Sequence, residues 1–547
     1  MELNMKKILS VLSVVATVLG MASCEKQLDS VKQLGSLGSE EFYENATDAD
    51  AEALATSMYN TAWEQLSNTR MESYTDDYVS TDPYKTINAD GFDSGLYAGM
   101  YQLIYKANLI LERLSDDTPA KKRVIGEAYF MRGWAYFNLI RGWVTPPYVD
   151  HVLSSDELAD MTNGETSALW QLCFESLQQA SDMLPAKSGK AGQHALGARV
   201  TKHTALAFLG KAYLYAGDKT KAAAALKQVI DSNLYGLLPN YADLYTVNAD
   251  WSEEYLWEFN ASDSDADMRG TEYRMNFTQV WRAEYVTMPG GVHLSGFNQG
   301  YLQSFPSKKF YDWIVRREGA GNRRMATVWS FEEAAHMFVE LSDPSLAGTP
   351  NYEGDNLAAM LAAHPGITTE QAGMRLLWSG DMSLPSLNTC QGALGAKIYI
   401  WHSDMYPATY TADLFSMANY PAMRYSDVLL LYAEAANDVN ALNQVRQRAG
   451  LPALGSYSDA ELRDERRAEF WGEGERFWDC VRWGIASTEF AEVGKTTYET
   501  SCNPATYEIS VSAVPVSDWI GWDDKYTRFP YTTSELRQTS IKQNQGW

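Results

Sequence analysis

The chain has 547 residues, of which 45% are apolar and 12% aromatic, and this composition excludes an intrinsically disordered protein. Its 70 acidic residues outnumber its 45 Lys and Arg residues, which gives a formal net charge of −25. Nucleic-acid binding depends on clustered basic side chains that neutralise phosphates, and no such cluster occurs, so we expect no nucleic-acid partner.

The N-terminus has the pattern of an export signal. Lys6 and Lys7 precede an apolar run over residues 8–22, which is shorter than the ~20 residues that span a bilayer. Small residues stand directly before Cys24, as in a bacterial lipoprotein cleavage site, where the cysteine becomes the acylated first residue. We therefore predict a lipoprotein signal peptide over residues 1–23 and a lipid on Cys24. The alternative is an ordinary signal peptide followed by an incidental cysteine.

The folded body is predicted to be a single, mostly α-helical unit over residues 40–547, reached through a polar tether over residues 24–39. Its clearest element is a helical hairpin over residues 201–232, in which alanines recur at helical spacing on both sides of Gly217-Asp218. Small residues let two helices approach closely, so this hairpin resembles a tetratricopeptide repeat. The same periodicity predicts three further pairs: 51–66 with 96–114, 127–143 with 169–185, and 425–437 with 439–449.

Two long irregular stretches interrupt this tetratricopeptide-like scaffold, at residues 71–101 and 260–416, with a short helix predicted over 307–317. Loops of this length are usually functional or disordered, and their aromatic content argues against disorder. Carboxylates accept hydrogen bonds from sugar hydroxyls, and aromatic rings stack on the apolar face of a pyranose. The predicted ligand-binding residues are Asp76, Asp77, Tyr78, Tyr84, Trp281, Tyr285 and Tyr301. The alternative for each aromatic ring is packing within its loop.

The sequence contains no arrangement typical of an enzyme. The best catalytic candidate is the pair Asp76-Asp77, but adjacent side chains on an irregular loop usually point apart. A glycosidase needs two carboxylates that face one cleft at about 5–9.5 Å, and no such pair is apparent. Motifs of serine hydrolases, zinc proteases and nucleotide-binding proteins do not occur either. We expect no catalytic residue and no cofactor; a surface glycoside hydrolase is the alternative.

Cysteine and histidine spacing does not indicate a metal site. The cysteines other than Cys24 are Cys173, Cys390, Cys480 and Cys502, without a CxxC pair or a histidine at ligand spacing. Cys173 and Cys480 lie in helical patterns with apolar neighbours, where a buried free thiol is the commoner outcome. We therefore favour a chain without an obligatory disulfide.

A segment rich in charge and tryptophan lies near the C-terminus, at residues 466–484. Ser458 followed by Glu461 is a capping box, which predicts that a helix begins there. This helix would carry one apolar stripe formed by Leu462, Phe470, Phe477 and Val481. It would also carry two ion pairs at a spacing of three, Glu473 with Arg476 and Asp479 with Arg482. Carboxylates beside cations have lowered pKa values, so we interpret the segment as scaffold rather than as an active site.

The same segment resembles a known family. "ERRAEFWGEGERFWDCVRWG", residues 465–484, is similar to the C-terminal signature of the SusD/RagB family of outer-membrane nutrient-binding lipoproteins. The resemblance continues in the family's order with "GEAYFMRGWAYFNLIRGW" from residue 126, "ARVTKHTALAFLGKAYLYAGD" from 198, "MRYSDVLLLYAEAAN" from 423, "LNQVRQRAGLP" from 442 and "QNQGW" from 543. Three departures concern local packing: Cys480 in place of Leu, "PVS" at residues 515–517 in place of Pro-Ile-Pro, and a short connection between the helices of the last pair.

The resemblance implies a function. Members of this family are non-catalytic lipoproteins that lie on the cell surface at the outer membrane. They capture oligosaccharides, or peptides in some members, and deliver them to a SusC-like TonB-dependent transporter. We expect the same of this protein: an oligosaccharide ligand, a transporter partner, and membrane contact through an N-terminal lipid.

Overall fold

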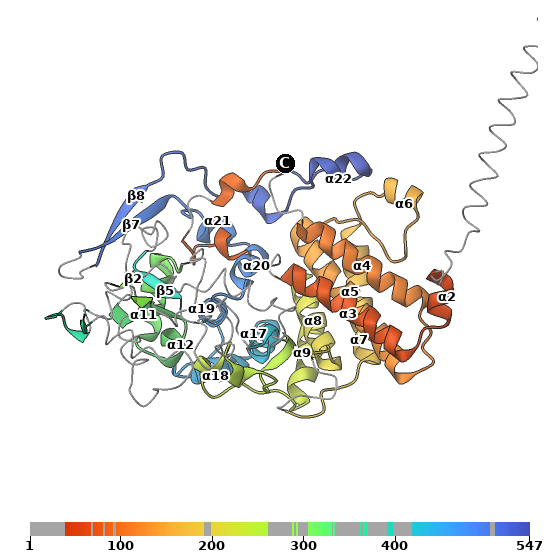
Figure 1. Cartoon of the computed structure of the whole chain (residues 1–547), viewed down its shortest axis with the longest axis horizontal. Helices are drawn as coiled ribbons and strands as arrows, with labels where there is room; N and C mark the ends of the chain where they lie inside the picture. The colour runs from red at the N-terminus through yellow and green to blue at the C-terminus, as the bar shows by residue number, and fades with distance from the viewer. Residues whose placement is uncertain are drawn as a thin grey trace, which may run out of the picture.

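The computed structural model describes residues 39–260, 305–333 and 418–547 apart from short gaps, together with short segments between residues 287 and 397. Helices dominate it (Figure 1). The helices of its N-terminal half are α2 (Ser39–Glu44), α3 (Asp48–Leu66), α4 (Gly95–Arg113), α5 (Pro119–Trp143), α6 (Ser155–Ala159), α7 (Thr166–Met183), α8 (Lys202–Tyr215) and α9 (Lys219–Asp231). Those that follow are α11 (Lys308–Glu318), α12 (Asn322–Met325), α17 (Tyr425–Ala436), α18 (Val439–Arg448), α19 (Asp459–Glu469), α20 (Glu475–Arg482), α21 (Ala486–Glu489) and α22 (Thr533–Gln538).

The predicted helix pairs are confirmed. Helix α3 packs on α4, α5 on α7, α8 on α9 and α17 on α18, while α7 packs on α8 and α9 on α17, so that the pairs form a continuous array. Figure 1 shows this array from α3 to α9 on one side of the molecule and α17 to α20 at its centre. The short helix predicted over 307–317 is α11, and Ser307 is its N-cap.

Polar caps and small residues explain the local geometry of the pairs. Asp218 caps α9 by accepting a hydrogen bond from the backbone of Lys221. At the α8–α9 contact, a Cβ on Gly210 would lie 2.5 Å from Leu226 Cγ, so only a glycine permits this approach. Gly133 of α5 has the same role against Leu177 of α7, where the distance would be 2.6 Å.

One buried apolar core runs through the array, and a smaller cluster lies around Phe310 and Trp471 beside α11. The described residues contain no helix that is both long and apolar enough to cross a membrane.

The strands form two-stranded antiparallel sheets, of which β1–β6 belongs to the main core. Pairing connects β1 (Tyr255–Phe259) with β6 (Tyr420–Arg424), β2 (Thr287–Met288) with β3 (Val292–His293), β4 (Val328–Ser330) with β5 (Ala393–Gly395), and β7 (Thr496–Cys502) with β8 (Ile509–Pro515). The β7–β8 hairpin extends from the body beyond α21 (Figure 1). Sequence periodicity did not predict this hairpin.

Candidate binding site

The irregular stretch that follows α3 is tied to the C-terminal half by a buried ionic cluster. Arg467 of α19 donates from Nε to Asp77 Oδ1 at 2.8 Å and from Nη2 to Asp76 Oδ2 at 3.0 Å. Arg476 of α20 donates to Asp76 Oδ1 at 3.2 Å, and the Lys309 ammonium lies 2.7 Å from Asp76 Oδ2. These contacts fix the loop against α11, α19 and α20.

The two carboxylates of this cluster are engaged by cations or enclosed by the protein. Burial raises the pKa of Asp76, but the charges of Arg467, Arg476 and Lys309 outweigh it and hold that pKa below its ordinary value. Burial raises the pKa of Asp77, whose side chain is only 1% exposed. A general acid must reach a substrate, and Asp77 is enclosed by the protein.

Two of the tyrosines predicted as ligand contacts, Tyr78 and Tyr84, are also buried. The Tyr78 ring stacks on Trp471 with centroids 5.1 Å apart and planes 4° from parallel. The Tyr84 ring is fully buried and stacks on Tyr526 at 5.0 Å, and its hydroxyl donates to the carbonyl oxygen of Tyr74 at 2.8 Å. In this structure the Tyr84 ring packs against the C-terminal segment, and its role as a ligand contact stays a prediction.

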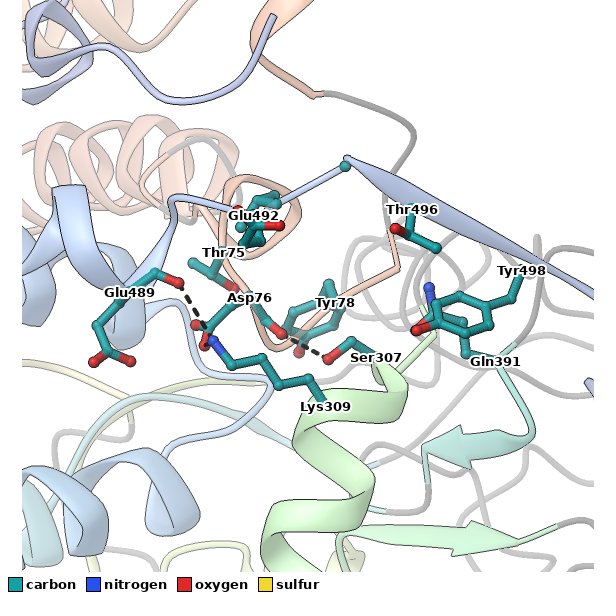
Figure 2. Close-up of a pocket in the computed structure, with 12 residues that line it drawn as sticks. Thr75, Asp76, Tyr78, Ser307, Lys309, Gln391, Glu489, Glu492, Thr496 and Tyr498 are labelled. Carbon is teal, nitrogen blue, oxygen red and sulfur yellow. Dashed lines mark hydrogen bonds and ion pairs between the residues drawn. The ribbon is translucent and has the colours of Figure 1, made fainter. Parts of the chain in front are cut away.

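A pocket opens beside Asp76 and Tyr78, with a cavity volume of about 180 Å³. Its walls come from the loop after α3, the start of α11, the segment before β5, and the chain from α21 into β7. The lining residues are Thr75, Asp76, Tyr78, Ser307, Lys309, Gln391, Glu489, Glu492, Val493, Gly494, Thr496 and Tyr498. Figure 2 shows Gln391, Thr496 and Tyr498 at one end of the pocket and Glu489 at the other. Of the predicted site residues, the structure thus brings Asp76 and Tyr78 to a cavity.

Hydrogen bonds hold the floor of this pocket in place. Ser307 caps α11 by accepting from the backbone of Phe310, and it donates from Oγ to the carbonyl oxygen of Asp76 at 2.6 Å. Gln391 Oε1 accepts from the backbone N–H of Lys308 at 2.7 Å. Lys309 also donates to the carbonyl oxygen of Glu489 at 3.4 Å (Figure 2). The pocket therefore has a pre-formed polar lining of the kind that fixes the orientation of a small ligand.

Several lining residues were not predicted from the sequence. Lys309 and Gln391 belong to stretches without a motif. Gln391 is held at the site by its hydrogen bond with Lys308, which lies 83 positions earlier in the chain. Tyr498 lies in "TTYETSC", whose β-branched and aromatic residues are a usable signal for a strand. The other predicted ligand contacts, Trp281, Tyr285 and Tyr301, lie outside the described residues, and their role stays a prediction.

The segment at residues 466–484, interpreted from the sequence as scaffold, contains a dense set of buried ion pairs. Arg466 is fully buried and donates to Asp427 at 2.8 Å and to Asp479 at 2.7 Å. Glu469 accepts from Arg323 at 3.1 Å and from Arg424 at 3.0 Å. The charges of the surrounding cations overcome the effect of burial and hold the pKa of Glu469 below its ordinary value.

Two details of the predicted segment were wrong. The single helix is broken into α19 and α20 because Gly472 and Gly474 adopt φ angles of 81° and 82°, which L-residues with a Cβ rarely adopt. Glu473, in this turn, pairs with Arg424 at 2.6 Å and with Lys397, not with Arg476. The predicted pair of Arg482 with Asp479 is confirmed at 2.8 Å.

The structure tests the predictions about cysteines and metal ligands only at the residues that it describes. Cys173 and Cys480 are free and buried, as expected, and burial raises the pKa of both thiols. In the part of the chain that the structure describes, no three His, Cys, Asp or Glu side chains are grouped to hold a metal ion.

Family models identify the class of protein to which this chain belongs. The model of the SusD family matches residues 251–547, more than half of the chain. A second model, described as "Starch-binding associating with outer membrane", matches residues 16–214. The chain belongs to the SusD family.

Individual relatives and solved structures agree with this assignment. SusD-like protein P38 of Formosa agariphila is 24% identical over 498 residues, which cover 84% of this chain and 88% of that protein. A SusD-like protein of Bacteroides ovatus is 23% identical over 510 residues, covering 86% and 82%.

Two solved structures share the fold. A laminarin binding SusD-like protein superposes with a TM-score of 0.66 and 21% identity, covering 91% of this chain and 99% of that chain. Surface glycan-binding protein A from Bacteroides thetaiotaomicron, in complex with laminarihexaose, has a TM-score of 0.63, 19% identity, and coverage of 91% and 100%. The predicted mostly helical, tetratricopeptide-like fold is thereby confirmed.

Proposed function

We propose that this protein is a non-catalytic glycan-binding lipoprotein, which captures oligosaccharides at the cell surface and passes them to a TonB-dependent outer-membrane transporter. The observation that carries the proposal is the polar pocket beside Asp76 on a SusD scaffold. Hydroxyl, amide, ammonium and carboxylate groups line it together, and this mixture of donors and acceptors suits the hydroxyls of a sugar.

The relatives support the choice of ligand. One similar structure is named for laminarin and another contains laminarihexaose, while the model that matches the N-terminal part is described as starch-binding and associated with the outer membrane. Laminarin, laminarihexaose and starch are all uncharged. An uncharged ligand suits a protein with a formal net charge of −25, because such a protein repels polyanions.

The N-terminal sequence and the family support the proposed attachment and delivery. A lipid on Cys24 would hold the protein at the membrane through the tether over residues 24–39. A binder fixed to a membrane does not move its ligand inward by itself, so delivery requires a transporter, which in this family is SusC-like. Weak binding suits such a transfer, because the ligand must also leave.

Calorimetry with laminarihexaose and maltohexaose at low and high salt tests the proposal. We expect a dissociation constant between about micromolar and millimolar for at least one of them, with little change between the two salt concentrations. A reducing-end assay on the same mixtures should detect no cleavage. Failure of both glycans to bind would contradict glycan capture, and the appearance of new reducing ends would instead indicate a glycoside hydrolase.

A further inference from the structure

The side chain of Gln391 has only one orientation that satisfies its neighbours. Its Oε1 accepts a hydrogen bond at 2.7 Å from the backbone N–H of Lys308, the first residue of α11. The first N–H groups of a helix have no acceptor within the helix, and a backbone N–H can only donate. The oxygen of the amide must therefore face Lys308, and Nε2 must occupy the other branch.

The Nε2 group of Gln391 is a donor without an acceptor. Gln391 is only 7% exposed and lines the pocket, and no residue in the described part of the chain accepts a hydrogen bond from its Nε2. Nε2 is not one of the polar atoms that the protein fully encloses without a partner, so it is open to the pocket, where water or a ligand oxygen can accept from it. An oxygen atom supplied from within the pocket would complete this amide.

The charges around the pocket indicate which kind of oxygen fits. The Lys309 ammonium already pairs with Asp76 at 2.7 Å, and Arg476 pairs with Glu489 at 2.6 Å. An anionic ligand would find both cations engaged and would meet the carboxylates of Glu489 and Glu492 in the same lining. The acceptor that suits this site is an uncharged oxygen, such as a sugar hydroxyl or ring oxygen.

We propose that Gln391 determines specificity in this pocket by donating from Nε2 to an oxygen of an uncharged sugar unit. This inference rests on the proposed glycan-binding function and places one sugar unit of the glycan beside Gln391. Tyr498 lines the same end of the pocket from β7 and is partly exposed, so its ring or hydroxyl contacts the same unit (Figure 2). A sugar unit that carries a carboxylate does not suit this pocket, because Glu489 and Glu492 would repel it.

The substitution Gln391→Glu isolates the donor. Glutamate keeps the shape and the oxygen that accepts from Lys308, but it replaces the Nε2 donor with a second acceptor. Calorimetry with the full-length mature protein should show about tenfold weaker binding of laminarihexaose or maltohexaose, whichever the parent binds, at an unchanged melting temperature. The matched control is Gln228→Glu, which adds the same charge on the exposed face of α9 and should bind like the parent.

Further variants keep the inference testable if Gln391→Glu destabilises the fold. Tyr498→Ala changes a partly exposed hairpin side chain and should also weaken binding several-fold. The parent should not bind trigalacturonate, and tight binding of this acidic probe would overturn the assignment of an uncharged ligand. Equal affinity of the parent and both variants for a neutral glycan would overturn the inference while leaving glycan binding intact. Failure of the parent to bind any neutral glycan would overturn the proposed function and this inference with it.

Discussion

The α5–α9 array and the α17–α20 region are both helical, but different interactions hold their helices together. In the array, Gly133 and Gly210 let apolar side chains of α7 and α9 pack directly against α5 and α8. In the α17–α20 region, buried arginines join helices, strands and loops, as Arg424 does for Glu254, Glu469 and Glu473. Apolar close packing tolerates little change of shape, whereas a buried ionic cluster tolerates little change of charge.

This difference places the candidate binding site on the ionic side of the molecule. The loop that carries Asp76 is fixed by Arg467 and Arg476, and α11 is linked to α19 by Arg317, which donates to Glu465 at 2.8 Å. Directional, charge-assisted hydrogen bonds fix irregular backbone at defined positions, which apolar contacts do less well. The apolar array serves as a rigid support, and the ionic region positions the pocket.

Breaking the ionic region should have the largest effect on stability. Arg424→Met removes one cationic partner from each of three buried carboxylates, and we expect a loss of about 3–5 kcal/mol in the free energy of unfolding. Urea unfolding at pH 7 measures it. Lys227→Met is the control, since it removes an exposed pair with Asp231 on α9 and should leave the unfolding midpoint unchanged. Similar effects of the two substitutions would contradict the role assigned to the buried cluster.

The contrast also explains which parts of the fold the sequence predicts. Helix pairs such as α8–α9 depend on neighbours three or four positions apart, so their periodicity is visible in the chain itself. The ionic partners are distant in sequence, and Arg467 meets Asp77 across 390 positions. The two glycines between α19 and α20 could have predicted the break, but the strong charge pattern around them favoured one continuous helix.

The candidate site was predictable only in part, for a related reason. An aromatic residue in a loop either packs inward or faces a ligand, and the sequence does not distinguish the two outcomes. Tyr84 packs inward against Tyr526, while Asp76 lies at the pocket and is nevertheless neutralised by arginines. Gln391 carries no sequence signal, because its significance depends on one hydrogen bond to Lys308.

Strand β1 lies outside both helical regions and contains a buried carboxylate, Glu258, that should make stability depend on pH. Burial raises the pKa of Glu258 to about 7 and outweighs the hydrogen bonds from Asn419 and the backbone of Trp251, which lower it. The folded protein therefore keeps a proton that the unfolded chain loses near pH 4.5, so this group stabilises at low pH and its contribution is lost as pH rises to about 7. Replacing Glu258 with Gln should abolish a pH-dependent contribution of at most about 3 kcal/mol.

Urea unfolding of the parent and the Glu258→Gln variant at pH 5 and pH 8 measures this difference. The variant should gain stability relative to the parent at the higher pH. In the ionic region, Asp427 should respond in the opposite sense, because Lys211 and Arg466 overcome burial and lower its pKa to about 2, so its contribution is lost only as pH falls below about 4. A constant difference between the parent and the Glu258 variant at the two pH values would contradict the raised pKa.

Overfilling the apolar array should have the smallest of these effects. Gly210→Ala places a Cβ 2.5 Å from Leu226 Cγ and 3.2 Å from the carbonyl oxygen of Ala222, so α8 and α9 must move apart. The contact is as short as 2.5 Å, so we expect strain in the upper part of the usual range, about 2–3 kcal/mol. The better helix propensity of alanine offsets about 1 kcal/mol of it, which leaves a net loss of about 1–2 kcal/mol. Gly455→Ala is the matched control, because a Cβ there meets nothing within 4 Å and the backbone φ is not positive. Thermal unfolding of the two variants should separate them. If Gly210→Ala is as stable as the control, the α8–α9 contact is looser than a close-packed pair, and small residues do not explain how the array is held together.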